Sequence, residues 1–335
     1  MNRRSTVKPN DTKTTNNMGV RGLPGFLARA SPTLRSTPSW KELEGKTLGI
    51  DVLGLLYKAK AMNQSIFAYL GRFVLACRAH AITPVFVFDG KPPEEKRGTL
   101  QARATQRRNA IEHTSDSKAW TPRVASPYLT SEERDQAKQL LYACGVMSLN
   151  ASGEADFVLA HFSKRGHFAA VISNDFDLLA RGVTNLLVPE PYALPGDESG
   201  WASYHLPTIL RTIELTYTQF LDMCVLMGCD YTSGQSHLIY KTAYWAIRFR
   251  GTLEDIAAPQ DLPAYKKAKE LLSGVFDTQE SLMGEKQWDK WIAGTPPIER
   301  EALTSFRGTR LKALTHDEFH LLCDDGLHDT DMEGG

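Results

Sequence analysis

Carboxylates stand at the ends of short apolar runs that are typical of β-strands. The runs 47–50, 84–88 and 168–173 are rich in β-branched, aromatic or small apolar residues, and an acid follows closely after each. A single Asp at such a place is more often a helix cap or a loop residue. A set of seven is harder to explain by packing, and it comprises Asp51, Asp89, Glu154, Asp156, Asp175, Asp177 and Asp230.

This set predicts a divalent-metal site. Carboxylates that are brought together repel one another, so cations or protons must neutralise them. Hard oxygen ligands suit Mg²⁺ or Mn²⁺, and two such ions about 4 Å apart can activate a water for in-line attack on a phosphodiester. A metal-dependent phosphatase fits less well, because its usual motif has acids two residues apart after the first strand, whereas Asp51 precedes Val52, Leu53 and Gly54.

A basic segment lies between two of these acids. Residues 91–108 hold six Lys and Arg against two Glu, although the whole chain has 39 basic and 39 acidic residues. Such a patch is either a solvated helix face or a grip on phosphates. Tyr57 is by default a core aromatic, and its functional interpretation is a base-stacking platform near the acids. The basic candidates are Lys91, Lys96, Arg103 and Arg107, the last three spaced for one helix face.

Strands and helices alternate along the chain, which favours an α/β fold with a twisted, mostly parallel sheet and helices on both faces. In such sheets ligands bind beyond the carboxyl ends of the strands, so acids spread over 180 residues can converge there. We expect strands at 47–51, 84–88, 146–149 and 168–173, and helices at 22–30, about 54–80, 131–144, 154–164 and from Phe220 to Met227.

Composition bounds the class of protein. A chain of 335 residues with 42% hydrophobic content is long enough for one main core. Its longest apolar runs are far shorter than the ~18 residues of a membrane span. The five Cys residues lack paired spacing, which favours free thiols in a reducing compartment. Residues 1–17 are polar, without an apolar signal core, and we expect them to be disordered.

The motifs together resemble the XPG/flap-endonuclease family of structure-specific 5′ nucleases. Six of them occur in the family's order between residues 18 and 256, which makes the resemblance specific. They are Met18-Gly-Val-Arg-Gly-Leu, Gly49-Ile-Asp51, Val85-Phe-Val-Phe-Asp89-Gly-Lys-Pro-Pro, Gly153-Glu154-Ala-Asp156, Ser173-Asn-Asp175-Phe-Asp177 and Leu226-Met-Gly-Cys-Asp230-Tyr.

The resemblance implies a PIN-like 5′-nuclease fold and Mg²⁺-dependent hydrolysis of DNA at flaps or junctions during replication or repair. The seven acids would hold two Mg²⁺ ions, for which Mn²⁺ can substitute. Lys96 and Arg103 would act on the scissile phosphate, and Tyr57 would stack beside it. The other substrate-binding candidates are Gly19, Lys91, Arg107 and Lys241.

Several departures bear on the substrate. The stretch 109–125 is too short and polar for a full second arch helix, so we expect a reduced helical arch. The hairpin after Asp230 keeps only Lys241 and Ala243 in register, and a clamp-binding peptide is missing from the C-terminal sequence. The short form is similar to nucleases of large DNA viruses. A tail before Gly19 would crowd the substrate, so either Met18 is the true start or the tail passes outside.

We therefore expect a disordered extension at 1–17, a nuclease domain at 18–256 with motif regions 18–108 and 128–256, and a helical C-terminal region with an acidic tail at 257–335. The protein would be a monomer that binds DNA with single-strand to duplex junctions and no membrane. It would act in the nucleus or at a site of viral DNA replication, not in mitochondria. A 5′-3′ exonuclease, a four-way-junction resolvase, a non-catalytic nucleic-acid-binding protein and an RNA-directed activity remain alternatives.

Overall fold

The computed structural model describes residues 19–91, 96, 105, 129–197, 200–232, 237–274, 286–290, 298–307 and 314–323. Two expectations, the disordered extension and the reduced arch at 109–125, lie outside these residues. Within them, no helix has the length and apolar character needed to cross a membrane.

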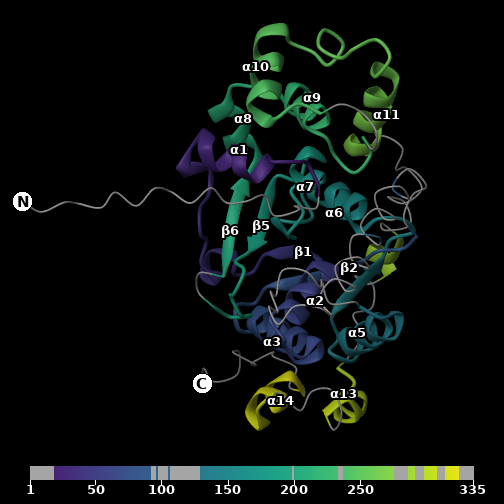
Figure 1. The fold of residues 1–335 in the computed structure, drawn as a ribbon. Coiled ribbons are helices and arrows are strands. Elements are labelled where there is room, and N and C mark those ends of the chain that lie inside the picture. The colour runs from purple at the N-terminus through teal and green to yellow at the C-terminus, as the bar shows by residue number, and fades with distance from the viewer. Residues whose placement is uncertain are drawn as a thin grey trace, which may run out of the picture.

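A six-stranded sheet runs through the molecule in the order β3-β2-β1-β4-β5-β6 (Figure 1). The first five strands are parallel, and β6 pairs antiparallel with β5. The predicted mostly parallel α/β sheet is thereby confirmed. The strands are β1 (Thr47–Asp51), β2 (Thr83–Phe88), β3 (Met147–Asn150), β4 (Ala170–Ile172), β5 (Asn185–Pro189) and β6 (Trp201–His205).

Helices cover both faces of this sheet. On one side lie α2 (Val52–Ala61), α3 (Ile66–Ala79), α5 (Ser131–Ala143), α13 (Arg300–Arg307) and α14 (His316–Cys323). On the other side lie α1 (Leu23–Ala30), α6 (Ala155–Lys164), α7 (Asp177–Ala180), α8 (Leu206–Ile213), α9 (Tyr217–Met227), α10 (Tyr240–Arg250) and α11 (Leu262–Ser273). Two short 3₁₀ turns, η1 (Pro32–Leu34) and η2 (Trp40–Leu43), lead into β1.

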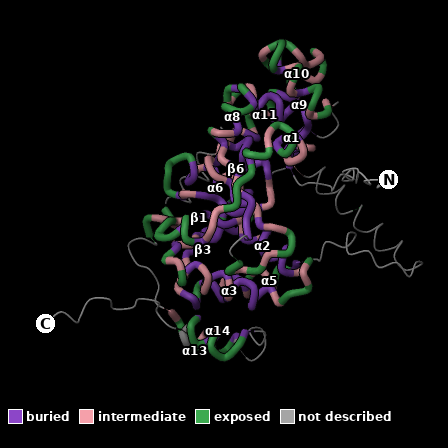
Figure 2. The backbone as a smooth tube through the Cα atoms, turned by 90° about the vertical axis from the view of Figure 1, so that its left-hand side faces the viewer, coloured by how far each residue is buried: buried purple, intermediate pink, exposed green. Residues whose placement is uncertain are grey.

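The alternation of side chains along the strands builds two cores. On β2, Val85 and Val87 belong to the core beneath α6 and α9, whereas Phe86 and Phe88 belong to the core beneath α3 and α5. Successive residues of a strand point to opposite faces, so an uninterrupted apolar run is what a doubly covered strand requires. Figure 2 shows the buried segments running through the middle of the molecule between the outer, exposed turns.

The elements differ from the sequence expectations in three ways. The single helix expected at about 54–80 is two helices, because Asn63 adopts a left-handed φ of 54° and the Ser65 side chain caps α3 by accepting a hydrogen bond from the Ala68 amide. The strand expected at 168–173 is confined to Ala170–Ile172. The strands β5 and β6 were not predicted at all.

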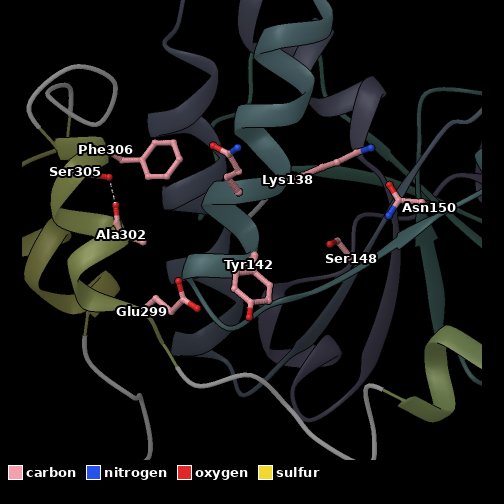
Figure 3. A pocket seen from close by; sticks show the side chains of 9 residues that line it. Lys138, Tyr142, Ser148, Asn150, Glu299, Ala302, Ser305 and Phe306 are labelled. Carbon is pink, nitrogen blue, oxygen red and sulfur yellow. Dashed lines mark hydrogen bonds between the residues drawn. The ribbon is translucent and has the colours of Figure 1, made fainter.

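The two C-terminal helices pack against the outer helices of the sheet. The Glu299 amide donates to the Ala143 carbonyl at 2.9 Å, and Arg72 of α3 pairs with Glu318 of α14 at 2.9 Å. A pocket opens between α5, β3 and α13 (Figure 3). None of the seven predicted ligand acids lines it; the lining residues are Lys138, Gln139, Tyr142, Ser148, Asn150, Glu299, Ala302, Ser305 and Phe306.

Close packing of α6 on β1 sets the position of the predicted site. Gly49 in the middle of β1 is buried, and a Cβ atom there would lie 2.5 Å from the Phe168 ring and 2.9 Å from Leu159 of α6. Because Asp51 ends β1 while Glu154 and Asp156 begin α6, this close approach also brings the two sets of acids together.

We expect Gly49→Ala to lower the free energy of unfolding by about 1–3 kcal/mol, because overpacking a filled core forces its neighbours to shift. Urea unfolding followed by circular dichroism measures the change. Gly25→Ala in α1 is the matched control: its added Cβ would meet its nearest neighbour at 3.9 Å, so stability should stay the same or rise by up to about 1 kcal/mol. Unchanged stability of Gly49→Ala would contradict the tight contact.

Candidate active site

Asp51 joins the carboxyl ends of two neighbouring parallel strands. One of its oxygens accepts a hydrogen bond from the Gly54 amide at 3.2 Å and so caps α2. The other accepts a hydrogen bond from the Ser173 hydroxyl, just after β4, at 2.8 Å. The strand-end position predicted from the sequence thus serves as a helix cap and a link to the next strand at once.

Asp89 connects the end of β2 to the start of α6. Its Oδ1 accepts a hydrogen bond from the Ala155 amide at 2.6 Å. Glu154 is the N-cap of α6, and Asp156 lies in its first turn. The Gly90 amide donates to the Gly153 carbonyl at 2.6 Å, which fixes the same junction. Three of the predicted ligand acids therefore meet at one helix end.

Asp175 and Asp177 form a short ladder after β4. The Asp175 amide donates to the Ser173 hydroxyl at 3.1 Å, and the Asp177 amide donates to the Asp175 carboxylate at 2.9 Å. The N-terminal segment closes over them, because the Val20 amide also donates to Asp177. Gly19 has a φ of 89°, and a Cβ atom there would collide with both carboxylates. Only glycine suits this position.

Lys96 and Asp230 complete the cluster. Asp230 follows α9 and is buried, and its carboxylate lies 3.2 Å from the Lys96 ammonium. The same ammonium pairs with Glu154. Lys96 therefore ties the acid after α9 to the acid that caps α6, and all seven predicted acids belong to one electrostatically connected group.

Burial and like charge destabilise the ionised acids. Burial raises the pKa of Asp51 to about 6, and the Asp89 carboxylate adds to this rise. Burial and neighbouring carboxylates also raise the pKa of Asp156, Asp175 and Asp177. Burial and the Glu154 carboxylate raise the pKa of Asp89 as well, although its side chain keeps some solvent access. The cluster therefore favours a bound cation over an empty, fully ionised state.

Glu154 behaves differently because protein cations surround it. Burial alone would raise its pKa, but Lys96 and then Arg181 outweigh that effect and hold the pKa below its ordinary value. The Tyr231 hydroxyl also donates a hydrogen bond to the Glu154 carboxylate. The sequence analysis missed Arg181 and Tyr231. Arg181 stands four residues after Asp177, one helical turn, and that spacing could have indicated it.

The other predicted substrate-binding residues lie on separate elements of the fold. Tyr57 is half-buried on α2 and packs against the core beneath α3 and α5. Lys91 is exposed, and its amide donates to the Ser152 carbonyl at 2.9 Å. Lys241 is exposed in the first turn of α10. Arg103 and Arg107 lie outside the described residues.

The residues of the cluster fit a divalent cation by donor type and charge. Carboxylate oxygens are the hard ligands that Mg²⁺ prefers. The raised pKa of Asp51, Asp156 and Asp177 shows that nearby positive charge does not fully compensate these acids when they are ionised. Within the described ranges, no three His, Cys, Asp or Glu side chains already form a metal cage. Their oxygens instead accept hydrogen bonds from backbone amides and contact Lys96 and Arg181.

Comparisons with known proteins identify a family for the part of the chain that contains these residues. A family model described as the XPG N-terminal domain matches residues 18–110, and one described as the XPG I-region matches residues 145–230. A probable flap endonuclease 1 homolog from Danio rerio is 31% identical over 244 residues, which cover 71% of this chain. The chain spans 65% of that relative's length.

Solved structures show the same fold. The flap endonuclease-1 from Methanococcus jannaschii superimposes with a TM-score of 0.59 at 20% identity, covering 86% of this chain and 95% of that one. Human GEN1 in complex with Holliday junction DNA superimposes with a TM-score of 0.57 at 16% identity, covering 91% and 77%. On the ordered motifs, the two family models and the shared fold, this chain belongs to the XPG/flap-endonuclease family of structure-specific nucleases, which hydrolyse phosphodiester bonds.

Proposed function

We propose that this protein is a divalent-metal-dependent 5′ nuclease that cuts DNA at flaps or at junctions between single strands and duplex, in replication or repair. The observation that carries the proposal is the convergence of seven carboxylates, with Lys96 among them, at the carboxyl edge of the parallel sheet. The relatives named as flap endonucleases favour a flap substrate over a four-way junction.

We assign the acids to two groups. Asp51, Asp89, Glu154 and Asp156 would hold one metal region, and Asp175, Asp177 and Asp230 the other. When bound, two Mg²⁺ ions, or Mn²⁺ in their place, supply an activated water and offset negative charge on the leaving oxygen. The protein's own part is to hold the oxygens in place through the Ala155 and Gly54 amides and the Ser173 hydroxyl.

Lys96 has a second role once substrate arrives. Its ammonium, paired with Glu154 and Asp230 in the structure, is close enough to the acids to turn toward a phosphate placed between them. There it would stabilise the charge that builds on the scissile phosphate, together with Arg103. Tyr57 would stack on a base, and Lys91, Arg107 and Lys241 would contact the phosphate backbone. Gly19, whose backbone lies against Asp175 and Asp177, would contact the substrate beside them.

We divide the chain into an extension at 1–17, a nuclease domain at 18–256 and a helical region at 257–335 with an acidic tail. The protein acts as a monomer wherever DNA is replicated, in the nucleus or at a site of viral DNA replication. The C-terminal helices α13 and α14 brace α5 and α3 and therefore support the sheet behind the site.

The decisive experiment incubates the full chain with end-labelled DNA and Mg²⁺, beside an EDTA control. The substrates are a 5′ flap, a nicked duplex, a blunt duplex, a four-way junction and the RNA version of the flap. Cutting of the flap at its junction supports the proposal. Preference for nicked or blunt ends would identify an exonuclease, preference for the four-way junction a resolvase, and binding without cutting a non-catalytic protein.

Asp177→Asn should reduce the cleavage rate by roughly 100-fold or more, because loss of one ligand charge costs at least as much as loss of an outer-shell partner. The substitution keeps the size of the side chain and the bond from the Val20 amide. Single-turnover cleavage of the flap under saturating enzyme measures it. The control is Asp135→Asn on the exposed face of α5, which should cut at the wild-type rate. Wild-type cleavage by Asp177→Asn would exclude Asp177 as a ligand.

The stability of the metal-free protein should fall as the pH rises from about 4 to about 6. Asp51 has a pKa of about 6 when folded against an ordinary value of 3.8, so the folded state holds more protons in this window. The stabilisation that protonation gives is therefore complete below the ordinary value and lost as the pH passes the folded value. Melting temperatures in EDTA across this range measure the slope. Asp51→Asn should flatten it, and so should Mg²⁺; a slope of the opposite sign would contradict the electrostatic account.

A further inference from the structure

We propose that Arg181 is a built-in counter-cation of the active site, a positioning residue that holds Glu154 and Asp156 while no divalent ion is bound. This inference rests on the proposed function, because it assigns a role within the same carboxylate cluster. It concerns a side chain that no sequence motif of the site contains.

The guanidinium is enclosed by the protein. Arg181 is the C-cap of α7, its amide donates to the Asp177 carbonyl at 2.8 Å, and its side chain is among the largest that are fully buried. The guanidinium carbon lies 4.0 Å from the centre of the Phe157 ring and 5.6 Å from that of the Tyr231 ring, whose hydroxyl accepts a hydrogen bond from the guanidinium. A charge buried in this way requires compensation by acids.

The compensation comes from the first turn of α6. One terminal nitrogen of Arg181 lies 3.5 Å from the Glu154 carboxylate and donates to the Tyr231 hydroxyl at 2.6 Å. Tyr231 in turn donates to Glu154. The other terminal nitrogen donates to the Leu271 carbonyl at 3.2 Å, which adds α11 to the same network. Glu154 is thus held both directly and through Tyr231.

Asp156 is held more loosely. It lies 3.9 Å from Nε of Arg181, close enough for charge attraction but too far for a hydrogen bond. That Nε is buried and has no hydrogen-bond partner among the described residues. Asp156 can therefore turn toward a cation in the cluster without breaking a hydrogen bond to Arg181. We infer that Glu154 is set in advance, whereas Asp156 is attracted to the guanidinium and released on metal binding.

Arg181 differs from Lys96 in what it can reach. Lys96 pairs with Glu154 and Asp230, and part of its side chain is exposed. Arg181 is buried, and the rings of Phe157 and Tyr231 and the Leu271 carbonyl already contact it. Arg181 therefore cannot move to contact a substrate phosphate, and its positive charge stays beside Glu154 and Asp156 whether or not substrate is bound. Removing that charge should strengthen the attraction for a divalent cation and weaken the metal-free fold.

The test compares Arg181→Met with the wild type by melting temperature in EDTA and in Ca²⁺. Met keeps an unbranched side chain of similar length but removes the charge. In EDTA we expect Arg181→Met to melt about 5 °C or more below the wild type, because acids lose their buried partner. Saturating Ca²⁺ should recover most of the loss. Calorimetric titration should show Ca²⁺ binding about tenfold tighter than in the wild type.

Two further variants keep the result interpretable. Arg181→Lys retains the charge and should show a Ca²⁺-induced rise close to that of the wild type, even if Arg181→Met folds only when Ca²⁺ is present. Arg211→Met on exposed α8 is the matched control and should behave as the wild type in both conditions.

Other outcomes count against one proposal or the other. A loss of melting temperature in Arg181→Met that is equal in EDTA and Ca²⁺, or unchanged Ca²⁺ affinity, would show a packing role and overturn the inference. A Ca²⁺-induced rise in Arg181→Lys as large as that in Arg181→Met would also overturn it. A wild type that neither binds nor is stabilised by Ca²⁺, Mg²⁺ or Mn²⁺ would instead contradict the metal-dependent function itself.

Discussion

Repulsion among acids at one edge of a parallel sheet is the constraint on which the structure depends. Burial and mutual charge raise the pKa of Asp51, Asp156 and Asp177, so the ionised cluster is unfavourable without positive charge. Parallel strands make the cluster unavoidable, since their carboxyl ends lie at the same edge. Every further feature near the edge, from the capping amides to Lys96 and Arg181, reduces that repulsion.

The two helical layers carry out different parts of this task. The core beneath α2, α3 and α5 is apolar and packs against one face of β1 and β2. The layer with α6, α7 and α9 brings acids into the site from the first turn of α6, the start of α7 and the end of α9. Gly49 lets α6 approach β1 closely, and Gly19 lets the N-terminal segment cross the acids. These two glycines thus allow the close approaches of α6 and of the N-terminal segment to the site.

The sequence predicted the strands that carry acids and missed the features set by tertiary contacts. Apolar runs ending at Asp51, Asp89 and Asp175 have a local signal, so their strands and their shared edge could be inferred. The helix break at Asn63 could not, because the apolar period continues through it. Strand β6 ends in polar Tyr204 and His205 and lacks an acid to mark it. Arg181 stands between Ala and Gly, and only its spacing from Asp177 could have indicated a role, because its partners Glu154 and Asp156 are brought to it by packing.

Lys96 and Arg181 are two cationic side chains of the site, and they would have different roles in the proposed reaction. A cation that both stabilises the metal-free fold and follows the phosphate would leave Glu154 unpaired at the moment of cleavage. Lys96, which is partly exposed, could leave its partners, because Glu154 and Asp230 keep other contacts. Arg181, held by Phe157, Tyr231 and a carbonyl, would remain at Glu154 whichever way Lys96 turns. In the proposed reaction this division would let one lysine serve the substrate while the arrangement of acids at the start of α6 is preserved.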